Sequence, residues 1–139
     1  MNLDVWRPYL PGKRNPIRAD ARRLPFRDQA FDVTVAVELL EHLDKKDGIF
    51  MVSEMERVSR RAVIFSTPKL WFEQPDIDGN PYQRHRSHYS RTDFPEYAYF
   101  EVPAPWGPFM FFHKGVSFDI CTSLVGGVQE VIDRLVGQL

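Results

Sequence analysis

Cysteine is nearly absent from this sequence, with Cys121 the single example among 139 residues. One thiol excludes an intramolecular disulfide and any zinc site built from several cysteines, which is typical of a reducing compartment. No apolar run is long enough to cross a bilayer, and no charged, then apolar, then small-residue leader opens the chain. These absences predict a soluble cytoplasmic domain with no membrane partner.

Net charge is also small, since 18 Lys and Arg residues face 19 Asp and Glu residues and leave a formal charge of -1. The bulk charge therefore predicts no overall field that attracts polyanions. A hydrophobic content of 43% over 139 residues is enough for one sizeable core. We expect a single domain over residues 1–139.

The chain alternates strand and helix patterns. Residues 2–6, 33–37 and 62–66 have the composition of strands, and the last two are nearly continuous in apolar residues, as parallel strands covered on both faces are. Between these two, Asp44 is expected to cap a helix with apolar residues at helical spacing. This order predicts a right-handed βαβ unit in an open α/β sheet.

The second half has a different texture. Residues 71–95 are rich in proline and predict a long ordered loop. Residues 97–102 and 109–113 are expected to be late strands, as an antiparallel pair. Residues 128–139 carry an apolar stripe at helical spacing and predict a helix that docks on the sheet or on a partner.

Acidic residues follow the predicted strands, where ligands bind in open parallel sheets. Asp4 could accept hydrogen bonds from ribose hydroxyls, while Asp20 and Ala21 could present a carboxylate and a small apolar face to a purine. The strongest strand is followed by Glu38, Glu41 and His42. Taken singly, these residues could be turn acids or helix caps. Their shared position at strand ends favours a binding site.

Several short motifs occur in a defined order: DA at 20–21, LPF at 24–26, FDV at 31–33, LEHL at 40–43, and Glu54 followed by ERV at 56–58. Together they resemble class I S-adenosylmethionine-dependent methyltransferases of the kind often labelled type 11, and the combined spacing is more specific than any one motif. The resemblance covers residues 2–68, the cofactor-site half, and leaves 69–139 as the substrate-side half.

The resemblance implies a Rossmann-like open, mostly parallel sheet flanked by helices. It implies S-adenosylmethionine as the cofactor, with Asp4 on its ribose, Asp20 and Ala21 beside its adenine, and Glu38 near its methionine end. The activity it implies is methyl transfer to a small-molecule or macromolecular acceptor, by in-line attack on the sulfonium methyl.

The sequence departs from the family at its beginning. The family opens with a strand and a GxGxG turn, whereas here nothing precedes Asn2 and none of the eight glycines opens a helix after a leading strand. We therefore expect an N-terminally truncated version of the fold, with weaker cofactor binding. Its sheet would have exposed edges beside residues 2–6 and 33–37, to be covered by a second copy or a partner subunit.

Histidines are the candidates for a general base. His42, His85 and His88 could each accept a proton from the methyl acceptor, although His42 could instead cap a helix and the other two could hold a loop. Substrate binding is expected from the segment GNPYQRHRSHYS at 79–90, specifically Asn80, Gln83, Arg84 and His85. The alternative for this segment is a solvated basic loop. No metal is predicted, because only His85 and His88 cluster and no cysteine accompanies them.

Two other interpretations stay open. The N-terminal part is rich in basic residues, and with the cluster at 84–91 these could bind an anionic ligand or RNA in a non-catalytic, methyltransferase-like subunit. The basic residues are Arg7, Lys13, Arg14, Arg18, Arg22, Arg23 and Arg27. The chain could also be a fragment of a longer methyltransferase.

Overall fold

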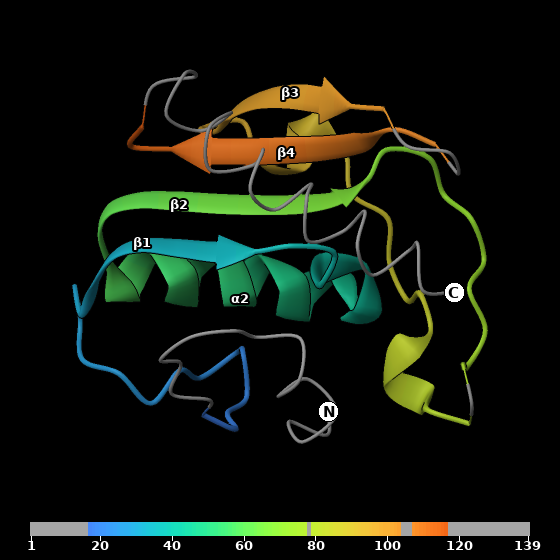
Figure 1. Cartoon of the computed structure of the whole chain (residues 1–139), viewed down its shortest axis with the longest axis horizontal. Helices are drawn as coiled ribbons and strands as arrows, with labels where there is room; N and C mark the ends of the chain where they lie inside the picture. Colours follow the sequence, from blue (N-terminus) through green and yellow to red (C-terminus); the bar gives the residue numbers. More distant parts are fainter. Residues whose placement is uncertain (1–16, 78, 104–106, 117–139) are drawn as a thin grey trace, which may run out of the picture.

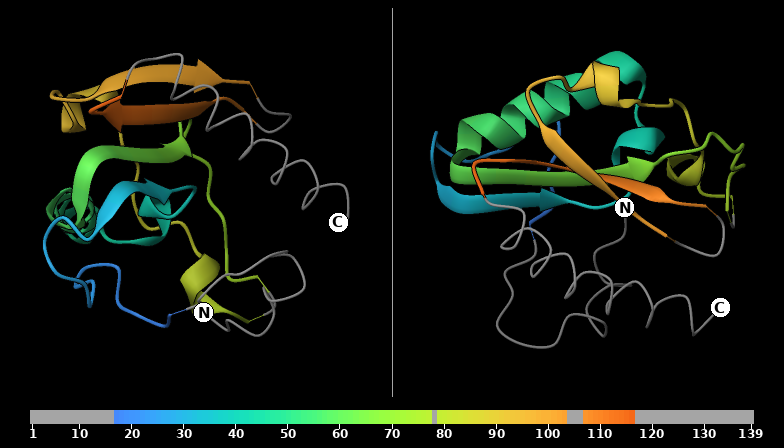
Figure 2. Two further views of the ribbon diagram at one scale, coloured as in Figure 1. Left: turned by 60° about the vertical axis from the view of Figure 1, so that its left-hand side comes forward. Right: turned by 90° about the horizontal axis from the view of Figure 1, so that it is seen from above.

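The computed structural model describes residues 17–77, 79–103 and 107–116. Within these ranges, four strands form one sheet and a long helix, α2, lies along one of its faces (Figure 1; seen from above in Figure 2). The strand predicted at 2–6 with Asp4, the predicted C-terminal helix and Cys121 lie outside the described residues. None of the helices in the described part has the length and apolar character of a transmembrane span.

The four strands are β1 (Phe31–Ala36), β2 (Ser59–Pro68), β3 (Ala98–Val102) and β4 (Phe109–Lys114), arranged in the order β1-β2-β4-β3. β1 and β2 are parallel, whereas β4 is antiparallel to both β2 and β3. Three of the four described strands therefore run in one direction. The predicted α/β class and the antiparallel late pair are confirmed.

Helix α2 (Lys45–Val58) connects the parallel strands β1 and β2. It begins after Asp44, as the sequence predicted, although the Asp44 side chain makes no capping hydrogen bond. Its buried residues follow helical spacing and face the sheet: Gly48, Met51, Val52, Met55 and Val58. The predicted βαβ unit is thus present.

The central strands β2 and β4 have buried side chains on both faces of the sheet. Val63, Phe65 and Phe112 belong to the larger core cluster together with residues of α2. Ile64 and Phe111, on the alternate positions, belong to a smaller cluster on the opposite face. Because side chains alternate between faces with a period of two, a strand buried on both sides needs an almost continuous apolar sequence.

Strand β1 forms one end of the described sheet and has β2 as its neighbour there. On its face opposite α2, the alternate residues Phe31, Val33 and Val35 are 39%, 36% and 49% exposed. At the edge of β1 that does not pair with β2, the family resemblance expects a further strand. Strand β1 therefore has more apolar side chains than its contacts within the described residues bury.

The segment between β2 and β3 runs past the carboxyl ends of β1 and β2 (Figure 1). It contains two short 3-10 helices, η3 (Pro81–Gln83) and η4 (Arg91–Asp93), and is otherwise irregular, as the proline-rich sequence predicted. Its Tyr89 is fully buried in the larger core cluster. Tyr89 thus anchors this largely exposed segment to the core.

Gly48 allows Tyr89 to pack directly against α2. A Cβ atom at position 48 would lie 2.0 Å from the Tyr89 hydroxyl oxygen, well inside van der Waals contact. The same hydroxyl donates a 3.4 Å hydrogen bond to the carbonyl oxygen of Lys45 in the first turn of the helix. Glycine is unfavourable inside a helix, but at position 48 it leaves the room that the Tyr89 ring needs to pack against the helix backbone.

We expect Gly48→Ala to lower the free energy of unfolding by about 1–3 kcal/mol, because overpacking a buried ring costs more than the roughly 1 kcal/mol gained in helix propensity. Denaturant unfolding followed by circular dichroism measures the change. Lys46→Ala, at an exposed position of the same turn, is the matched control. A Gly48→Ala protein as stable as wild type would contradict the packing argument.

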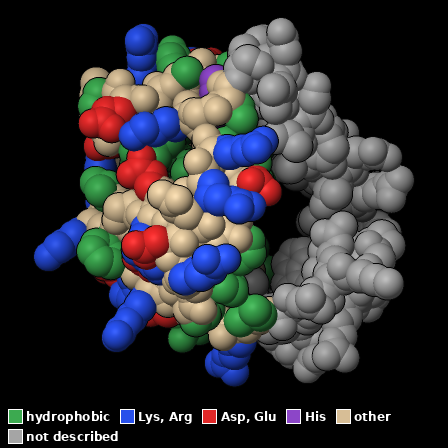
Figure 3. All heavy atoms as spheres, turned by 90° about the vertical axis from the view of Figure 1, so that its left-hand side faces the viewer, with side chains coloured by type: hydrophobic (Ala, Val, Ile, Leu, Met, Phe, Trp, Pro, Cys, Tyr) green, Lys and Arg blue, Asp and Glu red, His purple; other side chains and the backbone are tan. Residues whose placement is uncertain are grey.

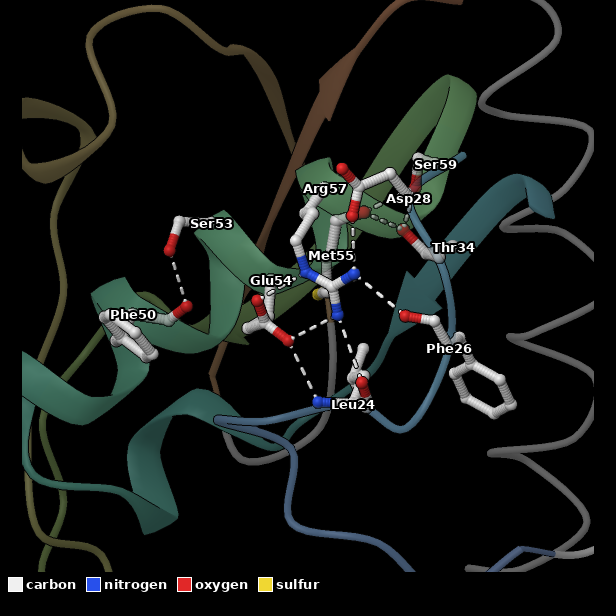
Figure 4. A network of polar contacts seen from close by, with 10 residues as sticks. All are labelled: Leu24, Phe26, Asp28, Thr34, Phe50, Ser53, Glu54, Met55, Arg57 and Ser59. Carbon is white, nitrogen blue, oxygen red and sulfur yellow. Dashed lines mark hydrogen bonds and ion pairs between the residues drawn. The ribbon is translucent and has the colours of Figure 1, made fainter. Parts of the chain in front are cut away.

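Arg57, in the last turn of α2, fastens the loop that precedes β1 (Figure 4). Its guanidinium donates to the carbonyl oxygens of Leu24 (3.0 Å) and Phe26 (2.8 Å) and to the Asp28 carboxylate (2.8 Å). Glu54 pairs with the same guanidinium at 2.7 and 2.8 Å and accepts the Leu24 amide at 2.9 Å. The family motif residues at these positions therefore shape the loop.

Replacing Arg57 with Met should release this loop, because two backbone carbonyls lose their donor and Glu54 loses its cation. Hydrogen exchange should then be faster at the amides of residues 24–29, including the Gln29 amide that donates to the Arg57 carbonyl. Arg60→Met is the control, since Arg60 pairs with the exposed Asp32. Equal protection of the loop in both variants would show that Arg57 does not hold it.

Candidate functional site

The candidate site lies at the carboxyl ends of β1 and β2, where Glu38 follows β1. Glu38 adopts a left-handed backbone conformation with φ of 49°, which is strained for a residue with a side chain. Its amide donates to the Ser66 hydroxyl oxygen at 3.1 Å, and that hydroxyl donates to Glu38 Oε1 at 2.6 Å. The sharp turn after β1 is thus fixed across both strand ends.

Glu41 lies in the short 3-10 helix η2 (Leu40–His42) and is only 3% exposed. Its backbone carbonyl accepts the amides of Arg86 (2.7 Å) and Ser87 (3.2 Å), so the long segment after β2 is fastened to η2. Its carboxyl is close enough to that of Glu38 for the two groups to influence each other's ionisation. The second oxygen, Oε2, is buried and has no hydrogen-bond partner among the described residues.

Burial controls the ionisation of this group of side chains. It raises the pKa of Glu38 to about 7, while burial and then the neighbouring Glu38 charge raise the pKa of Glu41 well above its ordinary value. Burial lowers the pKa of His42 and of His85, so both imidazoles are neutral at pH 7. The site therefore joins carboxyl groups that ionise with difficulty to imidazoles that remain basic acceptors.

His42 and His85 are held in the same way by backbone carbonyl oxygens. His42 Nδ1 lies 3.2 Å from the Arg84 oxygen, and His85 Nδ1 lies 3.1 Å from the Phe72 oxygen. A carbonyl only accepts, so we assign the proton of each neutral ring to Nδ1, which leaves each Nε2 with a free lone pair. The ring centroids are 5.1 Å apart, and His42 Nε2 is 3.9 Å from Glu41 Oε1.

A shallow depression opens beside this cluster. It is lined by Glu41, Thr67, Pro68, Leu70, Trp71, His85, Ser87 and His88. Of the three histidines predicted as bases, His42 and His85 meet at Glu41, whereas His88 is exposed, lies at the rim and bonds the Lys69 oxygen at 2.9 Å. Trp71 was not predicted from the sequence, although a tryptophan three residues after the end of β2 is a signal for an aromatic wall.

Asp20 and Ala21 lie on the loop before β1. The exposed Asp20 carboxylate pairs with Arg22 at 2.8 Å, and this contact lowers the Asp20 pKa to about 2. Arg22 also pairs with Asp47 in the first turn of α2 at 2.7 Å. Ala21 is partly buried against the larger core cluster. The loop that carries the predicted adenine contacts is therefore attached to the start of α2.

The predicted substrate segment, residues 79–90, contributes His85, Ser87 and His88 to the depression. Asn80 caps η3 by accepting the Tyr82 amide at 3.1 Å, and the Gln83 carbonyl accepts the Gln74 side chain at 2.7 Å. Arg84 pairs with Asp76 at 3.1 Å. His85 alone of the four predicted residues lines the depression, so the structure gives Asn80, Gln83 and Arg84 contacts that shape the segment.

Basic side chains on the surface are accompanied by acids. On the face drawn in Figure 3, Lys and Arg side chains are interleaved with Asp and Glu. Arg22, Arg57 and Arg84 each pair with a carboxylate. Arg7, Lys13 and Arg14 lie outside the described residues. Within the described ranges the charges are thus partly compensated, which gives the RNA-binding alternative no specific support.

Glu38 should make stability depend on pH. A carboxyl whose pKa is raised by folding stabilises the folded state below its ordinary pKa of about 4.5, and this stability is lost as the pH rises to about 7. In metal-free buffer we expect Glu38→Gln to gain about 1–3 kcal/mol relative to wild type between pH 4.5 and 8. Thermal unfolding against pH tests this, with the exposed Glu73→Gln as control. Parallel curves for wild type and Glu38→Gln would refute it.

Comparisons with known proteins bear on this arrangement. Residues 3–66 match the family described as methyltransferase domain, which confirms the resemblance to class I methyltransferases. The crystal structure of the PH0226 protein from Pyrococcus horikoshii OT3 superposes with a TM-score of 0.51 at 15% identity, over 73% of this chain and 58% of that one. It supports the Rossmann-like fold. The comparison with curated proteins found no match.

Proposed function

We propose that this chain, whose residues 3–66 match the methyltransferase domain, binds S-adenosylmethionine at the carboxyl ends of β1 and β2 and directs its methyl group to an acceptor. The family match carries this proposal. It ends at Ser66, the residue that holds the Glu38 carboxyl, so the matched segment includes the turn at which the candidate site begins. The cofactor would supply an electrophilic methyl group on a sulfonium leaving group.

The side chains present suit such a cofactor. Glu38 is a constrained carboxyl with a raised pKa, and a cationic amino group beside it would favour its ionised form and offset the cost of burial. Ala21 offers a small, half-buried surface on the loop expected beside the adenine. Asp20 would exchange part of its contact with Arg22 for the adenine amine. Asp4 remains the expected partner of the ribose hydroxyls.

The chain's own contribution to catalysis would be mainly positioning, because a reaction that displaces a sulfonium group in line depends chiefly on the distance and angle of approach. An acceptor that must lose a proton would find two neutral imidazoles with free Nε2 atoms, on His42 and His85. Trp71 and His88 line the depression next to them and would contact the acceptor. His42 and His85 therefore fit a proton-accepting role better than the exposed His88 does.

Calorimetric titration with S-adenosylmethionine and S-adenosylhomocysteine tests the proposal. Both should bind, and Asp4→Ala should weaken binding by about 10- to 100-fold, the loss of a charge-assisted hydrogen-bond acceptor worth about 1–3 kcal/mol. Asp44→Ala is the matched control, since the Asp44 side chain makes no capping bond. Absence of heat with either compound at millimolar concentration would reject cofactor binding by this chain, and equal affinities of the two variants would reject the ribose assignment.

A further inference from the structure

We propose that Glu41, His42 and His85 form a binding site for a divalent transition-metal ion, and that Zn²⁺ fits it best. Each of the three side chains offers one ligand atom, and the three atoms all lie within 4.8 Å of one another. They come from two separate segments, η2 and the long segment after β2, which the backbone hydrogen bonds to the Glu41 carbonyl hold together. The cluster is therefore a product of the fold rather than of a local sequence motif.

The two histidines are already oriented as ligands. Histidines that bind a metal usually donate their other ring N–H to a backbone carbonyl or a carboxylate, which fixes the tautomer and the direction of the free nitrogen. His42 and His85 both have this arrangement, through the carbonyl oxygens of Arg84 and Phe72. Each Nε2 consequently has a lone pair available for an ion. The rings also lie edge to face, with centroids 5.1 Å apart.

Glu41 would supply a carboxylate ligand when the ion displaces its proton, and one of its oxygens is unsatisfied within the described part of the chain. Its side chain is 3% exposed, and Oε2 has no hydrogen-bond partner among the described residues. Buried polar atoms are nearly always satisfied, so this orphaned carboxyl oxygen leaves the Glu41 side chain with bonding capacity that a bound ion could use. A cation held by this carboxyl and the two imidazoles would fill that role.

The donor set selects the class of metal. Two imidazoles and one carboxylate suit Zn²⁺ and related transition ions, whereas Mg²⁺ prefers oxygen ligands and retains water. Ligand atoms around tetrahedral zinc lie about 3.3 Å apart, given bonds of about 2.0–2.1 Å. His42 Nε2 and Glu41 Oε1 are already 3.9 Å apart. Small side-chain rotations would close the cluster and leave a fourth position open.

This inference revises the prediction that no metal binds. That prediction considered His85 with His88, its neighbour in the sequence. In the structure His88 faces the rim of the depression, and the partner of His85 is His42, 43 positions earlier in the chain. The proposal does not rest on methyl transfer, since metal binding can be measured without any cofactor.

The test is titration of the purified chain with ZnCl₂ after dialysis against a chelator, with MgCl₂ as the comparison ion. We expect one Zn²⁺ per chain, a raised melting temperature, and no response to Mg²⁺ at the same concentration. His42→Gln and His85→Gln should each weaken Zn²⁺ binding at least about tenfold. Even the loss of a group that only hydrogen-bonds to a metal ligand lowers metal affinity by about 10- to 100-fold. His88→Gln and Cys121→Ser should bind as wild type does.

Several outcomes would overturn the proposal: no zinc bound by the wild type, unchanged affinity in both His42→Gln and His85→Gln, or an equal loss in His88→Gln. If His85→Gln fails to fold, titration of the wild type with Co²⁺ decides, because tetrahedral cobalt with histidine ligands absorbs strongly in the visible and octahedral aqueous cobalt does not. A chain that binds zinc but neither S-adenosylmethionine nor S-adenosylhomocysteine would sustain this inference while rejecting the proposed function.

Discussion

The burial of Glu41 is the constraint around which this end of the molecule is organised. A carboxyl group that is 3% exposed must be supplied with partners by the protein, because water does not reach it. Its backbone carbonyl receives two amides from the long segment, and its side chain meets Glu38 and His42. Such a concentration of poorly solvated polar groups lowers stability locally, which is typical of functional sites rather than of structural ones.

A second charged centre, around Arg57, has the opposite character. There the guanidinium, its carboxylates and the backbone carbonyls of the loop satisfy one another almost completely (Figure 4). The two centres lie at opposite ends of α2, since Glu41 precedes its first turn and Arg57 is in its last. At the Arg57 end of the helix the polar groups satisfy one another's hydrogen bonds. At the Glu41 end, polar groups remain that could still bind a partner.

The sequence predicted the fold more completely than the site, for physical reasons that particular residues illustrate. The apolar texture of β2 and the spacing of Met51, Met55 and Val58 follow from local periodicity, which the chain displays directly. The proximity of His42 to His85 depends on how a long irregular segment returns to η2, and no local pattern encodes it. Likewise the motif residues Glu54 and Arg57 were recognisable as a family feature. That they hold the loop before β1 became clear only from their hydrogen bonds in the structure.

Gly48 illustrates the same limit, because a glycine in a helix looks unfavourable until the ring of Tyr89 is placed against it. Glu38 was expected near the cofactor from its position after β1, yet its strained backbone and its bond to Ser66 depend on the neighbouring strand. The sequence identified Glu38 but not Gly48, and in both cases the tertiary contact defined what the residue does.

The position of β4 between β2 and β3 has a consequence for the order of folding. The strands of the βαβ unit and of the β3–β4 hairpin pair over shorter distances in the sequence. The pairing of β2 with β4 instead closes a loop that contains the whole long segment between β2 and β3. Closing that loop is entropically the most demanding step of the three. His85 and Trp71 lie within this loop, so their positions beside Glu41 depend on a long-range pairing and not on either local unit alone.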